Sequence, residues 1–174
     1  FVGDSWTVGL IDNGLIKSEN ALAQVGASAY SLPGTPTPPS GTSGIIFALG
    51  KNDCSSAGIN ALKHLIDDTV TAYPNIPVYV LRLSYYGTNP YNGISASDVD
   101  SFNQTMQSYC ATKNSVNFVD PTIAINDSSA KTIKSEYNTS DNLHLTADGY
   151  KAWYEAISSA VGGGSSYEPT LTAV

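Results

Sequence analysis

The chain has 174 residues, 41% of them hydrophobic, which is enough for one domain of ordinary size with a substantial core. Its net charge of -7 comes from 15 acidic and 8 basic residues, and no basic cluster could follow a phosphate backbone. No apolar run approaches the roughly 20 residues that a membrane-spanning helix needs. These properties argue against nucleic acid as a partner and against a membrane span.

The composition and the two cysteines bear on the cellular compartment. Only 13% of the residues are charged, while Ser, Thr, Asn, Gly and Tyr abound, as is common in secreted proteins that act on carbohydrate. Cys54 and Cys110 could pair in an oxidising compartment. Alternatively, Cys110 lies on the apolar side of a predicted helix, where a free thiol packs as a small hydrophobe. We favour the buried thiol.

Short apolar runs alternate with segments of helical periodicity, which predicts βαβ units around a largely parallel sheet and an α/β fold. The central runs lack polar alternation, as expected for strands that are covered on both faces. The first run is shorter than a parallel strand usually is, so we expect either an upstream segment to complete it or the sequence to begin inside it. The predicted strands are residues 1–2, 21–25, 45–49, 78–83 and 117–119.

Three amphipathic helices are predicted from apolar side chains at helical spacing, and each should lie on the sheet. Pro74 marks the end of the first helix, Ser95 or Ser97 can cap the second, and Thr146 can cap the third. The stripes are Ile59, Leu62, Leu65, Ile66, Val70 and Tyr73; then Val99, Phe102, Met106, Tyr109 and Cys110; then Ala147, Tyr150, Trp153, Tyr154, Ile157 and Val161.

Other parts of the chain show no regular periodicity. The Gly- and Ser-rich run at 162–166 predicts a flexible linker, and residues 167–174 the start of a following segment. We therefore expect one domain over residues 1–161 within a larger multidomain chain. Long loops in a compact α/β domain often carry function. The loops expected here are residues 31–44, 85–95 and 126–140.

The motif Gly3-Asp4-Ser5 follows the first apolar strand, and a helix could begin just after it. A serine beyond the carboxyl end of a strand lies at the edge where open α/β sheets build their sites, and its N–H can face the same cleft as its hydroxyl. Gly-Asp-Ser is also an ordinary turn sequence. The motif alone is therefore weak evidence for a nucleophile.

Asp141 and His144 are three residues apart, just ahead of the last predicted helix. In a turn, the carboxylate can hold one imidazole nitrogen protonated while the other nitrogen accepts a serine proton. The alternative is a solvated aspartate beside a histidine at a helix entry. The only other histidine, His64, lies near the first helical stripe and is expected to be structural or exposed.

Asn52 directly follows the strand that ends near Leu49, in the sequence Gly-Lys-Asn-Asp, which places it at the same sheet edge as Ser5. Its amide could donate to an oxyanion, and losing one such donor typically costs on the order of 3 kcal/mol. The alternative for Asn52 is a simple strand-end turn. Gly26 follows the second strand and lets the backbone approach a bound ester, with its N–H as a further donor.

The order of these residues, each at a strand end or a helix entry, resembles the SGNH (GDSL-like) hydrolase family. Residues 1–5 (Phe-Val-Gly-Asp-Ser) resemble its nucleophile block, and residues 25–28 (Val-Gly-Ala-Ser) its glycine block. Residues 50–53 resemble its G-x-N-D block, and residues 141–144 its D-x-x-H block. The resemblance covers residues 1–161. It implies a three-layer α/β/α, flavodoxin-like fold whose mostly parallel sheet has about five strands.

The resemblance also implies a serine-hydrolase mechanism. Ser5 would be the nucleophile, His144 the general base, and Asp141 the residue that orients the histidine. The N–H groups of Ser5 and Gly26, together with the Asn52 side chain, would form the oxyanion hole. Neither a metal nor an organic cofactor is implied.

Four aromatic residues are candidates for contact with a substrate. Trp6 occupies the position where the family's older name has leucine, and we expect it to form a wall of the pocket. Tyr85, Tyr86 and Tyr91 lie in the loop after the fourth predicted strand, where aromatic faces could stack on sugar rings. The alternative is that these tyrosines anchor the loop to the domain.

A divalent-metal site built from Asp4, Asp53, Asp141 and His144 is a competing hypothesis, because carboxylates and imidazole are metal ligands. Nothing pairs these residues at the spacing of a known metal motif. A metal site would also leave Ser5 and Asn52 without a functional role. We therefore prefer the hydrolase interpretation.

The resemblance is closest to extracellular Firmicutes-type members, including esterases and O-acetyltransferase domains that act on peptidoglycan or other polysaccharides. It implies a bacterial enzyme, outside the cell or on its surface, that hydrolyses short-chain esters, first of all O-acetyl groups on a glycan. The lack of a long apolar lid argues against a long-chain lipase. The alternatives are an O-acyltransferase, a lipase or thioesterase with the same three residues, and a non-catalytic carbohydrate-binding module.

Overall fold

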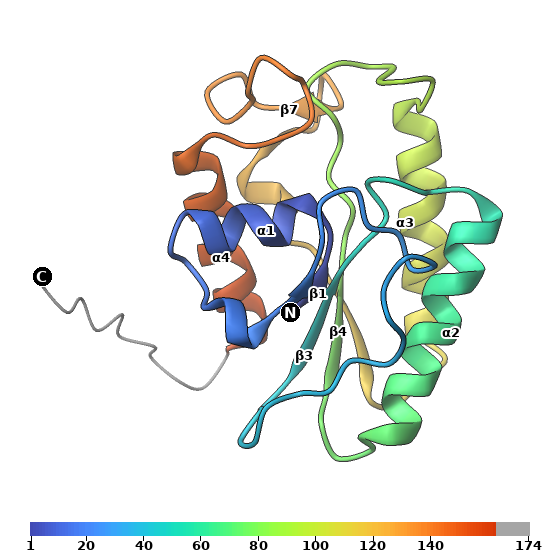
Figure 1. Cartoon of the computed structure of the whole chain (residues 1–174). Coiled ribbons are helices and arrows are strands. Elements are labelled where there is room, and N and C mark those ends of the chain that lie inside the picture. The colour runs from blue at the N-terminus through green and yellow to red at the C-terminus, as the bar shows by residue number, and fades with distance from the viewer. Residues whose placement is uncertain (163–174) are drawn as a thin grey trace, which may run out of the picture.

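A five-stranded parallel sheet forms the centre of the computed structural model, which describes residues 1–162 (Figure 1). The strands lie in the order β2-β1-β3-β4-β5, and all neighbours are parallel. This is the flavodoxin-like order, in which the connection changes direction at β1 and β3 and ligands bind beyond the strand ends at that point. The strands are β1 Val2–Gly3, β2 Leu22–Ala23, β3 Ile45–Ala48, β4 Val78–Leu81 and β5 Val116–Val119.

Helices cover both faces of this sheet (Figure 1). On one face lie α2 (Ser56–Ala72) and α3 (Ala96–Cys110), and on the other lie α1 (Ser5–Asp12) and α4 (Ala147–Val161). Each face therefore has its own apolar core. The predicted three-layer α/β/α fold is confirmed.

Alternate positions of the short strands supply the two cores. Phe47 of β3 is fully buried in the core that also contains Ile66 and Phe102. Its neighbour Ile46 belongs to the opposite core, with Trp153. Successive side chains of a strand point to opposite faces, so a strand covered on both sides needs apolar residues at every position.

The helices begin at the polar residues that the sequence indicated. Ser95 caps α3 and forms a reciprocal capping box, and Thr146 caps α4. Helix α2 ends at Ala72, two residues before Pro74. Cys110, at the end of α3, is buried, and both cysteines are free, which confirms the thiol interpretation.

The departures from the predicted elements are local. Strand β2 is shorter than expected because the chain turns after Gln24, where the Ala27 N–H donates to the Gln24 carbonyl. The loop expected at 126–140 contains a small antiparallel pair, β6 (Asn126–Asp127) with β7 (Thr132–Ile133). Single 3-10 turns occur at η1 (Ser18–Asn20) and η2 (Thr122–Ala124).

Two sequence-based expectations fall at the edge of what the structure covers. The predicted linker and the following segment lie outside the described residues, except for Gly162, which caps α4. Within residues 1–162, no helix combines the length and the apolarity needed to cross a bilayer.

Candidate active site

The candidate residues gather at the edge formed by the carboxyl ends of neighbouring parallel strands. Strand β1 leads directly into Ser5, β2 into the turn that holds Gly26, and β3 into the segment that holds Asn52. His144 reaches the same edge from the loop that precedes α4. The fold thus brings together residues that are up to 139 positions apart.

Ser5 is the first residue of α1. Asp4 caps this helix, since its Oδ1 accepts a hydrogen bond of 2.9 Å from the Trp6 N–H. The Ser5 N–H therefore belongs to the first helical turn, whose amides find no acceptor within the helix itself. Gly3 permits the tight passage from strand to helix, because a Cβ there would lie 1.9 Å from the Thr7 hydroxyl oxygen.

The turn that carries the acid and the histidine is built on the Asp141 carboxylate. Its Oδ1 accepts hydrogen bonds from the N–H groups of Leu143 and His144, at 2.8 and 2.9 Å, and lies 2.6 Å from the Thr139 hydroxyl. Asn142, at the apex, has a left-handed φ of 60°, a conformation that asparagine tolerates better than most residues. These contacts leave Oδ2 free to face the imidazole.

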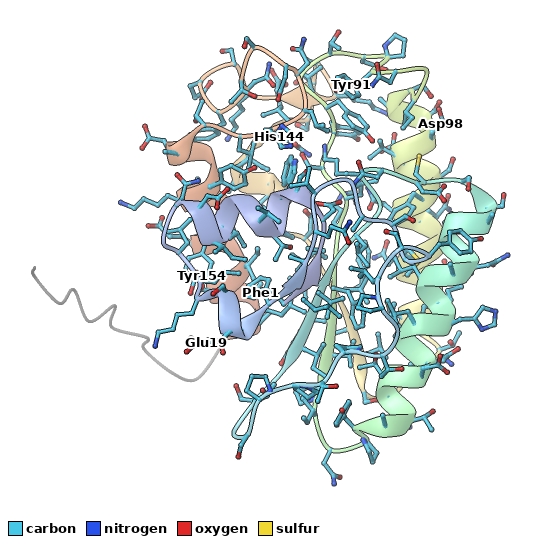
Figure 2. All side chains as sticks on the ribbon, in the orientation of Figure 1. Phe1, Glu19, Tyr91, Asp98, His144 and Tyr154 are labelled. Carbon is cyan, nitrogen blue, oxygen red and sulfur yellow. The ribbon has the colours of Figure 1, made fainter. Side chains whose placement is uncertain are left out.

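A continuous series of hydrogen bonds joins the three candidate residues. His144 Nδ1 lies 2.6 Å from Asp141 Oδ2, and His144 Nε2 lies 3.0 Å from Ser5 Oγ. Figure 2 shows His144 beside α1, the helix that begins with the serine. A carboxylate at Nδ1 favours the tautomer that carries its proton there, which leaves Nε2 as an acceptor for the serine hydroxyl.

The Asp141 carboxylate stays ionised over a wide pH range. Burial opposes its charge, but the hydrogen bonds from His144, Thr139 and Leu143 outweigh burial and hold the pKa of Asp141 well below its ordinary 3.8. An ionised carboxylate at Nδ1 stabilises the positive charge that an imidazole takes up when it accepts a serine proton.

Gly26 and Asn52 lie on two loops that are tied to each other. The Asn52 side-chain amide donates one hydrogen bond of 3.0 Å to the Ala27 carbonyl, which leaves its second hydrogen available. Gly26 has a φ of 74°, in the left-handed region that favours glycine. No heavy atom lies within 4 Å of where a Cβ would be, so glycine is favoured here by the backbone conformation and not by lack of space. Both residues are exposed and thus accessible to a ligand at this edge.

Trp6 is buried, so the expectation that it forms a wall of the substrate pocket is wrong. Trp6 is 3% exposed and packs edge-on against Trp153, with ring centroids 5.0 Å apart. Its Nε1–H donates to the Leu143 carbonyl at 3.0 Å. Trp6 therefore ties α1 to the turn that holds His144 and supports the site from inside.

Tyr85 and Tyr86 are also buried, so the expectation that they stack on sugar rings is wrong. They anchor the loop to the domain instead. The Tyr85 hydroxyl donates to Asp100 Oδ1, and the Tyr86 hydroxyl donates to the Lys51 carbonyl, each at 2.6 Å. Tyr86 is stacked on Tyr91, with centroids 4.8 Å apart and planes within 10° of parallel. The loop after β4 is thus fixed to the domain by its aromatic residues.

The competing metal site is not formed. Within the described part of the chain, no three side chains of His, Cys, Asp or Glu are grouped to hold a metal ion. Asp4 caps α1, and Asp53 accepts the Ser55 N–H at 3.1 Å. His64 is exposed on α2 and contributes nothing at this edge.

Sequence reasoning missed two residues near the site. The Thr139 hydroxyl lies 2.6 Å from Asp141 Oδ1 and 2.9 Å from the His144 carbonyl, so it braces the turn at both ends. Its place two residues before an aspartate in a turn was the available signal. Lys51 lies inside the G-x-N-D block with its side chain buried, and nothing in a loop sequence signals that a lysine points inward.

Solved structures define the class of fold. A candidate platelet activating factor from Streptococcus pneumonia matches with a TM-score of 0.73 and 20% identity, over 91% of this chain and 81% of that one. A GDSL-like lipase from Bacteroides thetaiotaomicron matches with a TM-score of 0.68 and 16% identity, over 94% of this chain and 86% of that one. A family 3 carbohydrate esterase from Talaromyces cellulolyticus matches with a TM-score of 0.61 and 15% identity, over 90% of this chain and 91% of that one.

The chain therefore has the fold of the SGNH (GDSL-like) hydrolases, as the sequence motifs predicted. No protein-family model and no curated protein sequence matches it. The C-terminal domain of Drosophila Oskar has the same architecture, with a TM-score of 0.68 and 13% identity over 92% of this chain and 86% of that one. Because one fold hosts different functions, the function has to be argued from the site.

Proposed function

We propose that this chain is a serine esterase that hydrolyses carboxylic esters, with Ser5 as nucleophile, His144 as general base and Asp141 as the orienting acid. The observation that carries the proposal is the unbroken series of hydrogen bonds from Ser5 Oγ through both ring nitrogens of His144 to Asp141 Oδ2. A serine hydroxyl is a weak nucleophile until a base within hydrogen-bond reach accepts its proton. The fold shared with a GDSL-like lipase and a carbohydrate esterase adds support.

Acylation begins when Ser5 Oγ bonds to the ester carbonyl carbon as its proton moves to His144 Nε2. The electron pair of the carbonyl π bond moves onto the oxygen, and the resulting oxyanion would accept hydrogen bonds from the Ser5 N–H, the Gly26 N–H and the Asn52 amide. When the carbonyl re-forms, the bond to the alcohol oxygen breaks. The departing oxygen takes the proton from His144 Nε2, and the acyl group stays on Ser5.

Deacylation repeats these steps with water in place of the alcohol. His144 Nε2 accepts one proton of the water while the water oxygen bonds to the acyl carbon. Ser5 Oγ then leaves and recovers its proton from His144, which releases the carboxylic acid. An acceptor hydroxyl in place of water would give acyl transfer by the same steps, so transferase activity differs only in the acceptor.

We further propose a short acyl group, first of all acetyl, on a hydroxyl of a polysaccharide or peptidoglycan, and a location outside the cell or on its surface. The polar, weakly charged composition favours such a substrate. A cavity of about 20 Å³ is lined by Asp4 and Trp6 but by neither Ser5 nor His144, so it does not limit the length of the acyl group.

The test of the esterase proposal is turnover of 4-nitrophenyl acetate. We expect the wild type to hydrolyse this ester, Ser5→Ala to fall to the uncatalysed rate, and the matched variant Ser101→Ala, on an exposed position of α3, to keep wild-type activity. A wild type without turnover, or a Ser5→Ala variant as active as wild type, would overturn the proposal.

The substrate is tested separately. We expect kcat/KM to decline along a series of 4-nitrophenyl esters from acetate to octanoate, and acetate to be released from at least one of O-acetylated xylan, peptidoglycan and pectin. A preference for the longest acyl chain would indicate a lipase instead. Glycan binding without acetate release, in a protein that Ser5-directed reagents do not label, would indicate a non-catalytic module.

A further inference from the structure

A buried lysine lies directly behind the candidate active site. Lys51 follows β3, and it is 5% exposed. Its Nζ donates a hydrogen bond of 2.7 Å to the Tyr85 carbonyl and lies 4.5 and 4.0 Å from the ring centroids of Trp6 and Tyr86. Lysine is almost never fully buried without a partner, because removing an ammonium group from water is costly.

The charge that faces this lysine across the interior belongs to Asp4, the residue next to Ser5. Asp4 is 1% exposed, and its Oδ1 caps α1. Its Oδ2 has no hydrogen-bond partner of good geometry among the described residues, although the backbone N–H of Lys51 is near enough to the carboxylate to favour its charged form. Burial raises the pKa of Asp4 to about 6 and lowers that of Lys51 to about 7, and the attraction between the two charges opposes both shifts. Each group thus partly compensates for the burial of the other.

The cavity of about 20 Å³ is lined by both of these side chains and by Trp153. The Nε1–H of Trp153 is a second buried polar group that has no partner within the described residues. Buried polar groups are nearly always satisfied, and a space of this size accommodates one water when two or more polar partners surround it. Asp4 Oδ2 can accept a hydrogen bond from such a water, and Trp153 Nε1 can donate one to it.

We propose that Lys51 is a positioning residue for Ser5, acting through Asp4 and a water in this cavity on one side and through Trp6 on the other, while Tyr85 and Tyr86 hold the lysine in place. The inference rests on the proposed esterase function and deepens it. Ser5 lies between Asp4 and Trp6 in the chain, and the ammonium of Lys51 interacts with both neighbours. The Tyr86 hydroxyl in turn holds the Lys51 carbonyl at 2.6 Å, which fixes the lysine from the opposite end.

A purely structural role for Lys51 leads to different results. Removing one partner of a buried pair of opposite charges lowers stability, because the remaining charge is left buried without compensation. If Lys51 has a purely structural role, its loss should therefore lower Tm and leave kcat of the folded protein unchanged. If Lys51 positions Ser5, kcat of the folded protein should fall as well, because a displacement of about 1 Å at a reacting group can cost on the order of 100-fold in rate.

The first experiment compares Lys51→Met with Lys63→Met, whose Nζ also lies over a tyrosine ring but on the outer helix α2. With 4-nitrophenyl acetate, at a temperature where the variant is folded, we expect kcat of Lys51→Met to fall at least ~10-fold with KM within ~2-fold, and Tm to be lower than that of wild type. The rate at which a fluorophosphonate labels Ser5 should fall by the same factor as kcat. Lys63→Met should match wild type in all of these measurements.

The second experiment needs no change of charge. Tyr86→Phe and Tyr109→Phe each remove a hydroxyl that donates to a lysine carbonyl, Lys51 at 2.6 Å and Lys63 at 3.1 Å. We expect Tyr86→Phe to lower kcat and the labelling rate together, and Tyr109→Phe to leave both unchanged. This pair decides the matter if Lys51→Met does not fold.

The outcomes separate this inference from the esterase proposal. An active wild type whose Lys51→Met and Tyr86→Phe variants keep kcat and labelling rate overturns the positioning role and leaves the esterase intact. A fall in Tm without a fall in kcat for the folded variants overturns it as well. A wild type that neither turns over ester nor is labelled at Ser5 shows that the esterase proposal itself is wrong.

Discussion

Ser5 lies between two pairs of ionisable side chains in opposite surroundings. The outer pair, His144 and Asp141, is partly exposed and joined by a hydrogen bond of 2.6 Å. The inner pair, Lys51 and Asp4, is buried and has no direct ion pair among the described residues. Hydrogen bonds keep the pKa of Asp141 low, whereas burial raises that of Asp4 to about 6. We expect the outer pair to move a proton and the inner pair to fix the position of the serine.

The largest expected effect comes from breaking the outer pair. His144→Ala removes the hydrogen-bond partner that the Ser5 hydroxyl has among the described residues, so kcat for 4-nitrophenyl acetate should fall by ~10⁴-fold or more. The matched change His64→Ala, on the exposed face of α2, should leave kcat unchanged. Comparable rates for the two variants would remove His144 from the mechanism.

A smaller loss is expected at the oxyanion. Asn52→Ala removes one amide donor without touching Ser5 or His144, so kcat should fall by ~10²- to 10³-fold while KM changes little. Asn60→Ala, at an exposed position of α2, is the control. If Asn52→Ala instead raises KM and leaves kcat intact, Asn52 binds the ground state and does not stabilise the oxyanion.

Particular residues show how far the sequence could predict this molecule. The buried strands and the helical stripes follow from apolar periodicity, and Ser5, Gly26 and Asn52 follow from their places at strand ends. The inward direction of Tyr85 and Lys51 did not follow, because an irregular loop has no periodicity that tells which side chains face the interior. The short pair β6 and β7 was missed because its polar residues resemble those of a loop.

The smallest effects concern stability, and they should have opposite pH dependence in the two pairs. Because the pKa of Asp141 is lowered in the folded protein, Asp141 contributes fully to the free energy of unfolding above pH 3.8, its ordinary pKa. This contribution is lost as the pH falls below 3.8. Asp141→Asn should therefore lower Tm at pH 7 and lower it less at pH 3. Thermal unfolding followed by circular dichroism would check this.

The pKa of Asp4 is raised to about 6, so Asp4 contributes fully to the free energy of unfolding below pH 3.8. This contribution is lost as the pH rises through about 6. Asn is as good a helix cap as Asp, so Asp4→Asn keeps the start of α1. The Tm of this variant relative to wild type should increase between pH 4 and pH 7. The same pH dependence for both variants would contradict the contrast between the two pairs.

The most direct measurement of the central claim is mass spectrometry after reaction with a fluorophosphonate. We expect a single covalent adduct on Ser5, formed rapidly by the wild type, slowed by several orders of magnitude in His144→Ala, and formed normally in His64→Ala. An adduct on another serine, or labelling of Ser5 at an equal rate in both histidine variants, would contradict it.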